Sequence, residues 1–144
     1  GRAHTTVVTY DNVPASAPVA QSLGIPTGTV VTEAVRIRFA DNAPVAVLHN
    51  WIPHTVGKIS KEELDTTGLY QLLRERGSVP QVGKQRIGAR KVTSGEAQQL
   101  DIESGAAVLT MERTAYDSMG RAIEHGEHIY RTDLYSLEFT VVNK

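Results

Sequence analysis

The sequence predicts an α+β domain whose mainly antiparallel sheet is built from two related helix–hairpin units. The first observation is an internal repeat: residues 23–31, Leu-Gly-Ile-Pro-Thr-Gly-Thr-Val-Val, recur at an offset of 77 as residues 100–108, Leu-Asp-Ile-Glu-Ser-Gly-Ala-Ala-Val. The second is that each copy follows a short helical segment and leads into two strand patterns joined by a turn. Two copies are too few for a solenoid, so we expect them to merge into one sheet with short helices packed on one side.

The first half of the chain is expected to contain a strand, a short helix and a hairpin. Residues 5–10 are rich in Thr and Val, which favours a strand, and Ser16 can cap a helix that ends near Leu23. The strands of the hairpin are expected at residues 30–39 and 45–52, because apolar and polar side chains alternate along the first of them.

Two further helices are expected before the second unit. Ser60-Lys-Glu-Glu63 has the sequence of a capping box, and Leu69, Leu72 and Leu73 recur at helical spacing before Gly77.

The second half repeats the order of the first. A strand at residues 85–92 precedes a helix opened by the capping box Thr93-Ser-Gly-Glu96, and a hairpin follows at residues 107–116 and 122–130. A last strand is expected at residues 136–142, which brings the prediction to about seven strands and four short helices.

Composition excludes several classes of protein. The 144 residues suit one domain, residues 1–144, and a formal net charge of −1 gives no basic footprint for nucleic acid. The chain has no cysteine, hence no disulfide framework, and no apolar run of the roughly 18 residues that a membrane span needs. We expect a cytoplasmic protein, and the start at Gly1 without a methionine suggests a piece of a longer polypeptide.

Arg36 and Arg38 are the first candidate binding residues. They lie two apart on an expected strand, so both guanidinium groups leave the same face, opposite an apolar stripe that includes Val35 and Ile37. Two forked donors at that spacing can hold one carboxylate or phosphate. The alternative is a solvated strand face with cross-strand ion pairs.

Glu124, His128 and Tyr130 are the second candidate group. All three occupy even positions of one strand and therefore share a face, with Ile123 and Ile129 expected on the other. In the repeat, this strand matches the strand at residues 45–52, so it can approach the two arginines across one cavity. The alternative is again a polar outer face.

Other chemistry has little support in the sequence. His125 and His128 are three apart on a strand, which places their rings on opposite faces, so no metal site is expected. No nucleophile motif is present and no cofactor is predicted. Tyr70, on the second of the two middle helices, can point into a cavity or cover the core.

Short motifs occur along nearly the whole chain. They are Leu23-Gly-Ile-Pro-x-Gly-Thr-x-Val, Arg36-x-Arg38, Pro44-Val-Ala, Trp51-Ile-Pro53, Gly68-Leu-Tyr-Gln-Leu-Leu73, Ala97-x-x-Leu100, Glu112-Arg113, and Ile123-Glu124 followed by Tyr130-Arg-x-Asp133-x-Tyr135. In these motifs and in their order, the chain resembles the effector-binding (UTRA) domain of the HutC subfamily of GntR-type bacterial transcription regulators.

This resemblance implies a chorismate lyase-like fold and an N-terminal winged helix-turn-helix domain, absent from this chain, through which alone the protein would contact DNA. It implies that Arg36 and Arg38 hold the anionic group of an effector, often a sugar phosphate, and that Tyr70, Glu124 and Tyr130 contact the rest. The protein would be a homodimer, because regulators of this type read paired half-sites.

Three departures from the family pattern bear on the effector. Relatives that bind amino-sugar phosphates usually carry Glu at the position of Leu48 and Ser at the position of Gly68. A Gly-Phe loop that often closes over the anion would lie upstream of Gly1. We therefore expect a small anionic effector, a sugar phosphate or carboxylate, other than the usual amino-sugar phosphate.

Two alternatives to a regulatory module stay open at this point. A chorismate lyase-like enzyme on the same fold would use the arginines to bind carboxylates and Glu124 to assist proton transfer. A dimerisation domain without a ligand is the other. The identity of the effector, the operator, the regulated genes and the sign of regulation do not follow from the sequence.

Overall fold

The computed structural model of the chain describes residues 2–135, 138, 140 and 141. Within them the strands are β1 (Ala3–Pro14), β2 (Val30–Ala40), β3 (Ala43–Pro53), β4 (Val82–Lys91), β5 (Ala107–Tyr116) and β6 (Ala122–Arg131). The helices are α1 (Ala17–Leu23), the 3-10 turn η1 (His54–Val56), α2 (Lys61–Thr66), α3 (Leu69–Glu75) and α4 (Ser94–Leu100).

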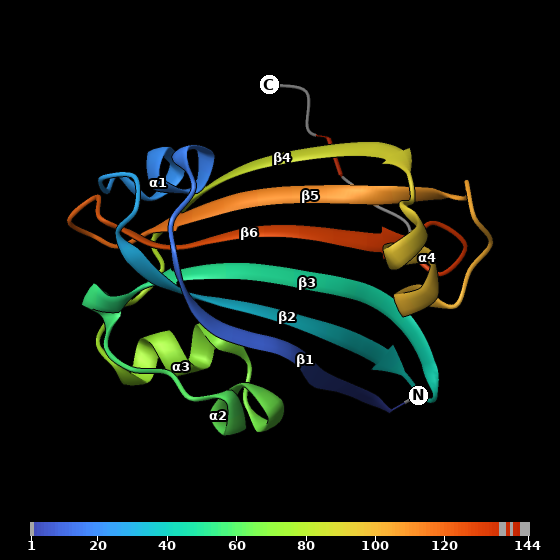
Figure 1. Cartoon of the computed structure of the whole chain (residues 1–144), viewed down its shortest axis with the longest axis horizontal. Helices are drawn as coiled ribbons and strands as arrows, with labels where there is room; N and C mark the ends of the chain where they lie inside the picture. The colour runs from blue at the N-terminus through green and yellow to red at the C-terminus, as the bar shows by residue number, and fades with distance from the viewer. Residues whose placement is uncertain (1, 136–137, 139, 142–144) are drawn as a thin grey trace.

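The strands form one antiparallel sheet in the order β1-β2-β3-β6-β5-β4 (Figure 1). The order reads the same from either edge, since each half contributes an edge strand, a middle strand and a central strand. The two central strands, β3 and β6, pair with each other and join the halves. The prediction of two repeated units merged into one antiparallel sheet is therefore confirmed.

Each repeated helix packs on a strand of the other unit, which locks the two halves together. Helix α1 packs against β6 and α4 packs against β3. Gly24 and Asp101, 77 positions apart, end these helices in the same left-handed conformation, with φ of 66° and 53°. The repeat seen in the sequence therefore extends to backbone conformation.

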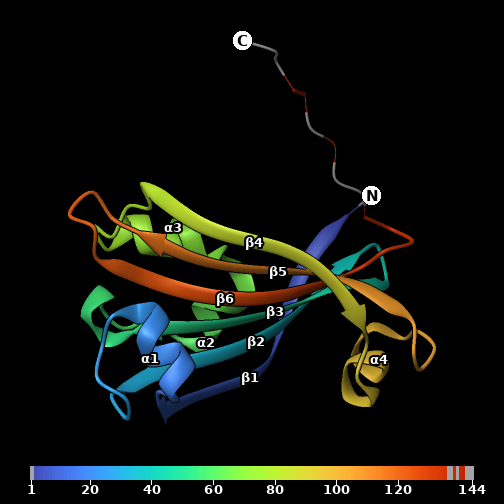
Figure 2. The ribbon, with the colours of Figure 1, turned by 90° about the horizontal axis from the view of Figure 1, so that it is seen from above.

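The helices cover both faces of the sheet (Figure 2), so the prediction that they pack on one side is wrong. One face carries α1 and α4, whose buried residues pack against Val31 and Val47, respectively. The opposite face carries α2 and α3 over one end of the sheet, where Leu64 and Leu73 belong to a separate core cluster. This arrangement leaves the middle of that second face, between α3 and the central strands, free to form a cavity.

Ile123 corrects one predicted strand face. Ala115 pairs with Glu124 and Tyr116 pairs with Ala122, so Ile123 is the extra residue of a β-bulge. Ile129 lies in the core under α4 as expected, whereas Ile123 packs in the cluster of α2 and α3, on the face of Glu124. Alternation of side chains could not reveal this bulge.

The strand expected at residues 136–142 falls largely outside the described residues, and the part of the chain that is described has six strands rather than seven. None of the described helices is long and apolar enough to cross a membrane.

Candidate functional site

A cavity of about 580 Å³ lies between the sheet and the segment that joins α2 to α3. Its floor comes from four neighbouring strands and its side wall from residues 64–70, with the start of β1 at the rim. A volume of this size suits a small molecule. The strand residues that line it are Arg36 and Arg38 of β2, Leu48 and Asn50 of β3, Met111 and Arg113 of β5, and His128 and Tyr130 of β6.

Arg36 is the most unusual residue of the floor, because only 7% of it is exposed and its charged guanidinium loses most of its hydration. Its Nη2 donates to Oδ1 of Asn50 at 2.9 Å, but its buried Nε has no hydrogen-bond partner among the described residues. Burial, with a further contribution from the charge of Arg38, lowers the pKa of Arg36 to about 10. Arg36 therefore stays charged at neutral pH, with an unfilled donor.

Glu124 lies beneath the cavity rather than on its surface. The side chain is fully buried, and its two oxygens accept hydrogen bonds from the Tyr70 hydroxyl at 2.8 Å and from Nδ2 of Asn50 at 3.0 Å. Arg113 Nε is 3.8 Å from the carboxylate, an ion-pair distance without a hydrogen bond. Burial raises the pKa of Glu124, and the hydrogen bond from Tyr70 opposes that shift.

His128 is a neutral polar group in the floor. Burial and the nearby charges of Arg113 and Arg36 lower the pKa of His128 to about 3, so the imidazole is uncharged at pH 7. Its buried Nδ1 has no hydrogen-bond partner within the part of the chain that the structure describes. The neighbouring Gly126 makes room for the ring, since a Cβ there would lie 2.7 Å from Nε2 of His128.

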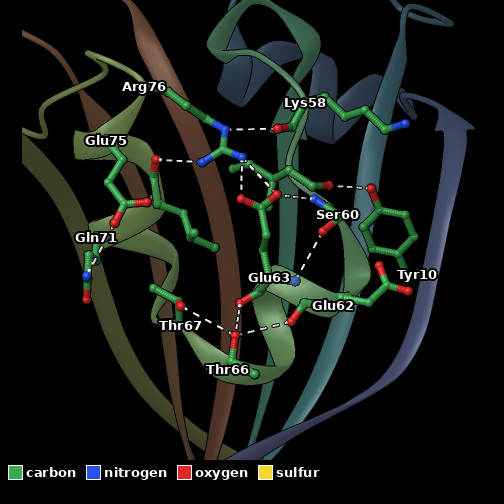
Figure 3. Close-up of polar contacts among 12 residues, drawn as sticks. Tyr10, Lys58, Ser60, Glu62, Glu63, Thr66, Thr67, Gln71, Glu75 and Arg76 are labelled. Carbon is green, nitrogen blue, oxygen red and sulfur yellow. Dashed lines mark hydrogen bonds and ion pairs between the residues drawn. The ribbon is translucent and has the colours of Figure 1, made fainter.

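The side wall is fixed by a polar network around Arg76, shown in Figure 3. The Arg76 guanidinium donates to both carboxylate oxygens of Glu63 and to the carbonyl of Lys58, joining the end of α3 to α2 and to the loop before it. Glu63 also completes the capping box with Ser60. The wall is thus held in place by contacts that lie outside the cavity.

Most of the residues predicted from the sequence meet at this cavity. Its lining includes Arg36, Arg38, Leu48, Gly68, Tyr70, His128 and Tyr130. Glu124 is the exception, since it supports the lining from behind. No cluster of three or more potential metal ligands occurs among the described residues.

Three residues of the cavity floor, Asn50, Met111 and Arg113, were not predicted from the sequence. The internal repeat could have indicated Arg113, because it lies 77 positions after Arg36 and is its counterpart in the repeat. No sequence pattern indicates Asn50, because its role is to bridge Arg36 to Glu124, and only the pairing of β3 with β6 reveals that contact.

Comparison with known proteins decides the family. A profile of the UTRA domain matches residues 1–136. The chain belongs to the UTRA domain family. It is an effector-binding domain of the kind found in GntR-family, HutC-type transcription regulators, and not an enzyme.

Sequence relatives and solved structures agree with this assignment. The UTRA domain is 28% identical over 131 residues to the HTH-type transcriptional repressor NagR of Bacillus subtilis, covering 90% of this chain and 54% of NagR. The chain thus spans about half the length of the curated relatives that it matches.

The fold recurs in crystal structures of bacterial regulators. A protein described as a transcriptional regulator from Streptomyces coelicolor is 41% identical with a TM-score of 0.93, covering 99% of this chain and 96% of that one. A ligand-binding domain described as that of a GntR-family regulator from Bordetella bronchiseptica has a TM-score of 0.90 at 23% identity, covering 99% and 92%. The second likeness concerns the fold alone.

Proposed function

We propose that this UTRA domain binds a small anionic effector in the cavity above β2, β3, β6 and β5, and that binding controls the DNA affinity of a helix-turn-helix domain in the same regulator. The observation that carries the proposal is Arg36, a buried cation with an unfilled Nε donor beside a second arginine. The likeness to NagR of Bacillus subtilis, an HTH-type transcriptional repressor, supports the regulatory part.

Two features of the arginine pair favour an anion beside it. An anion would accept hydrogen bonds from the two guanidinium groups. It would also favour the charged form of Arg36, whose pKa is lowered first by burial and then by the charge of Arg38. Each charged hydrogen bond formed in such a site contributes about 1.5–3 kcal/mol.

The rest of the cavity lining indicates which chemical groups the effector carries besides its anion. Leu48 and Met111 offer apolar surface, while Tyr130 and the neutral His128 can exchange hydrogen bonds with hydroxyl groups. Leu48 stands where relatives that bind amino-sugar phosphates usually carry Glu, so the floor of the cavity lacks a carboxylate that could pair with an amine. A phosphorylated sugar or a carboxylate without an amino group fits this lining.

A thermal-shift screen of sugar phosphates, sugar acids and other small carboxylates, followed by calorimetry on the best compound, tests the proposal. Arg38→Ala should weaken binding of that compound by about 1.5–3 kcal/mol, or roughly tenfold to 150-fold. Arg86→Ala, an exposed arginine on β4 outside this cavity, is the matched control. Binding that survives Arg38→Ala unchanged would contradict the proposal.

Signal transfer requires a second state of the regulator, and a homodimer supplies one. Effector binding would shift the balance between two arrangements of the dimer. Light scattering at tens of micromolar should give the mass of two chains, roughly the concentration range at which modest interfaces persist. A monomer at that concentration would contradict this part of the proposal and leave effector binding untouched.

A further inference from the structure

Arg36 and Arg113 are counterparts in the two repeats and face the same cavity. Arg36 lies on β2 and Arg113 on β5, with the central strands β3 and β6 between them. Neighbouring strands lie about 4.8 Å apart, so three spacings separate the two backbones by roughly 14 Å along the sheet. Each side chain has a buried Nε for which the described residues offer no hydrogen-bond partner. The internal symmetry has therefore produced two cationic ends in one cavity.

The two ends are separate places for an anion. The amide of Asn50 accepts from Arg36 and donates to Glu124, and the Glu124 carboxylate in turn lies 3.8 Å from Arg113. An amide and a carboxylate thus stand between the two guanidinium groups. An anion held by Arg36 and Arg38 would have this amide and carboxylate between it and Arg113.

Contacts within the protein do not use all the hydrogen-bond donors of Arg113. Glu124 already accepts a hydrogen bond at each oxygen, from Tyr70 and from Asn50. The guanidinium carbon of Arg113 lies 4.8 Å from the centre of the Tyr70 ring, which orients the group by a cation–π contact and leaves its donors free.

The charges around the cavity leave an excess of cation. Arg36, Arg38 and Arg113 face one buried carboxylate, that of Glu124. Asp65, at the rim, is paired with Lys61 and accepts from the amide of Val7. Three guanidinium groups and one carboxylate thus leave the cavity floor with a net positive charge, although the carboxylate lies at ion-pair distance from Arg113.

We propose that the effector carries two anionic groups, one held by Arg36 and Arg38 and the other by Arg113, joined by an uncharged middle that passes over Leu48 and His128. This inference rests on the proposed function, since it assumes that the cavity is the effector site. Leu48 and His128 share the register row of Arg36, whereas Arg113 shares the row of Asn50 and Gly126, so a linker between the two ends would leave the first row and cross to the second. The proposed effector is therefore a phosphorylated acid or a dicarboxylate. A ligand with a single anionic group would bind either Arg113 or the Arg36–Arg38 pair.

Matched pairs of synthetic probes test this class without knowledge of the natural effector. Each ω-phosphonocarboxylate is compared with the alkylphosphonate of the same chain length, over a series of lengths, because the span between the two ends is fixed by the protein. Calorimetry gives the ratio of the two dissociation constants at each length. At the best length the phosphonocarboxylate should bind at least about tenfold tighter, the smaller gain expected from one charged hydrogen bond.

Substitutions test whether Arg113 is responsible for the tighter binding of the phosphonocarboxylate. Arg113→Gln should bring the ratio to about one, Arg113→Lys should restore part of it, and the exposed Arg86→Gln on β4 should keep the wild-type ratio. Arg38→Gln should weaken both probes. Thermal unfolding of each variant without ligand shows whether it folds.

The outcomes separate this inference from the proposed function. If alkylphosphonates bind as tightly as phosphonocarboxylates at every length, or if the ratio survives Arg113→Gln, Arg113 is only a counter-ion of Glu124 and the inference is wrong while the anion site stands. If Arg38→Gln weakens neither probe, or no probe binds, the proposed site itself is contradicted.

Discussion

Tyr70 donates a 2.8 Å hydrogen bond to the fully buried carboxylate of Glu124, and this contact connects the side wall of the cavity to its floor. Tyr70 belongs to α3 and Glu124 to β6, 54 positions apart in the chain. Because the phenol also supports the Arg113 guanidinium, one side chain couples the position of the wall to the charges of the floor.

Tyr70→Phe should destabilise the domain by about 1–3 kcal/mol, because it leaves one oxygen of a buried carboxylate without its donor. Urea denaturation measures the loss. Tyr116→Phe, a half-buried tyrosine at the end of β5 outside the cavity lining, is the matched control. A loss no larger than that of the control would show that the bond to Glu124 contributes nothing to folding.

Stability should fall on acidification because of His128. Its pKa is about 3 in the folded protein, against 6.5 for an ordinary histidine, so the unfolded chain takes up a proton first as pH falls. The stability that His128 contributes is present above pH 6.5 and is lost between pH 6.5 and about 3. At pH 5 the loss is about 2 kcal/mol.

Urea denaturation at several pH values checks this in wild type and in His128→Gln, which cannot titrate there. The variant should lose less stability than wild type between pH 7 and pH 5. His54→Gln, on the exposed turn η1, is the control and should follow wild type. Parallel pH profiles for wild type and His128→Gln would contradict the burial of a neutral imidazole.

Arg76→Gln should loosen the side wall without touching its lining. The variant loses the paired hydrogen bonds to Glu63 and the bond to the Lys58 carbonyl that tie α3 to α2 (Figure 3). Hydrogen exchange of residues 60–75 should become faster, while exchange in β5 stays as in wild type. Arg74→Gln, exposed on the same helix, is the control, and equal exchange in the two variants would mean that the network does not hold the wall.

Local patterns in the sequence were enough to place the arginine pair and the repeated units. Alternation puts Arg36 and Arg38 on one face whatever the partner strand, and capping boxes mark the starts of α2 and α4. The pairing of β3 with β6 then brings the second group, His128 and Tyr130, to the same cavity.

Features that depend on pairing and depth could not be predicted in this way. The bulge at Ile123 arises from the pairing of β5 with β6, and the alternation of side chains along β6 alone does not indicate it. Glu124 shares a face with His128, yet one side chain is under the floor and the other in it. Parity assigns a residue to a face of the sheet, whereas burial depends on what α3 places above it.

Gly126→Ala should destabilise the domain by about 1–3 kcal/mol, the usual cost of overpacking a buried site. Gly126 lacks a positive φ, so the requirement is for space: a Cβ would lie 2.7 Å from Nε2 of His128 and 3.0 Å from Nδ2 of Asn50. The displaced Asn50 would also release its bond to Arg36, so affinity for the best anion of the ligand screen should fall with stability.

Gly95→Ala is the matched control for this substitution. Gly95 lies in α4 with open space around its Cβ position, and alanine there should stabilise the helix by about 0.5–1 kcal/mol. Urea denaturation and calorimetry on both variants give the comparison. If Gly126→Ala unfolds at the wild-type urea concentration and binds the anion as tightly, then His128 and Asn50 can move apart at no cost, and the rigid floor inferred from their burial is wrong.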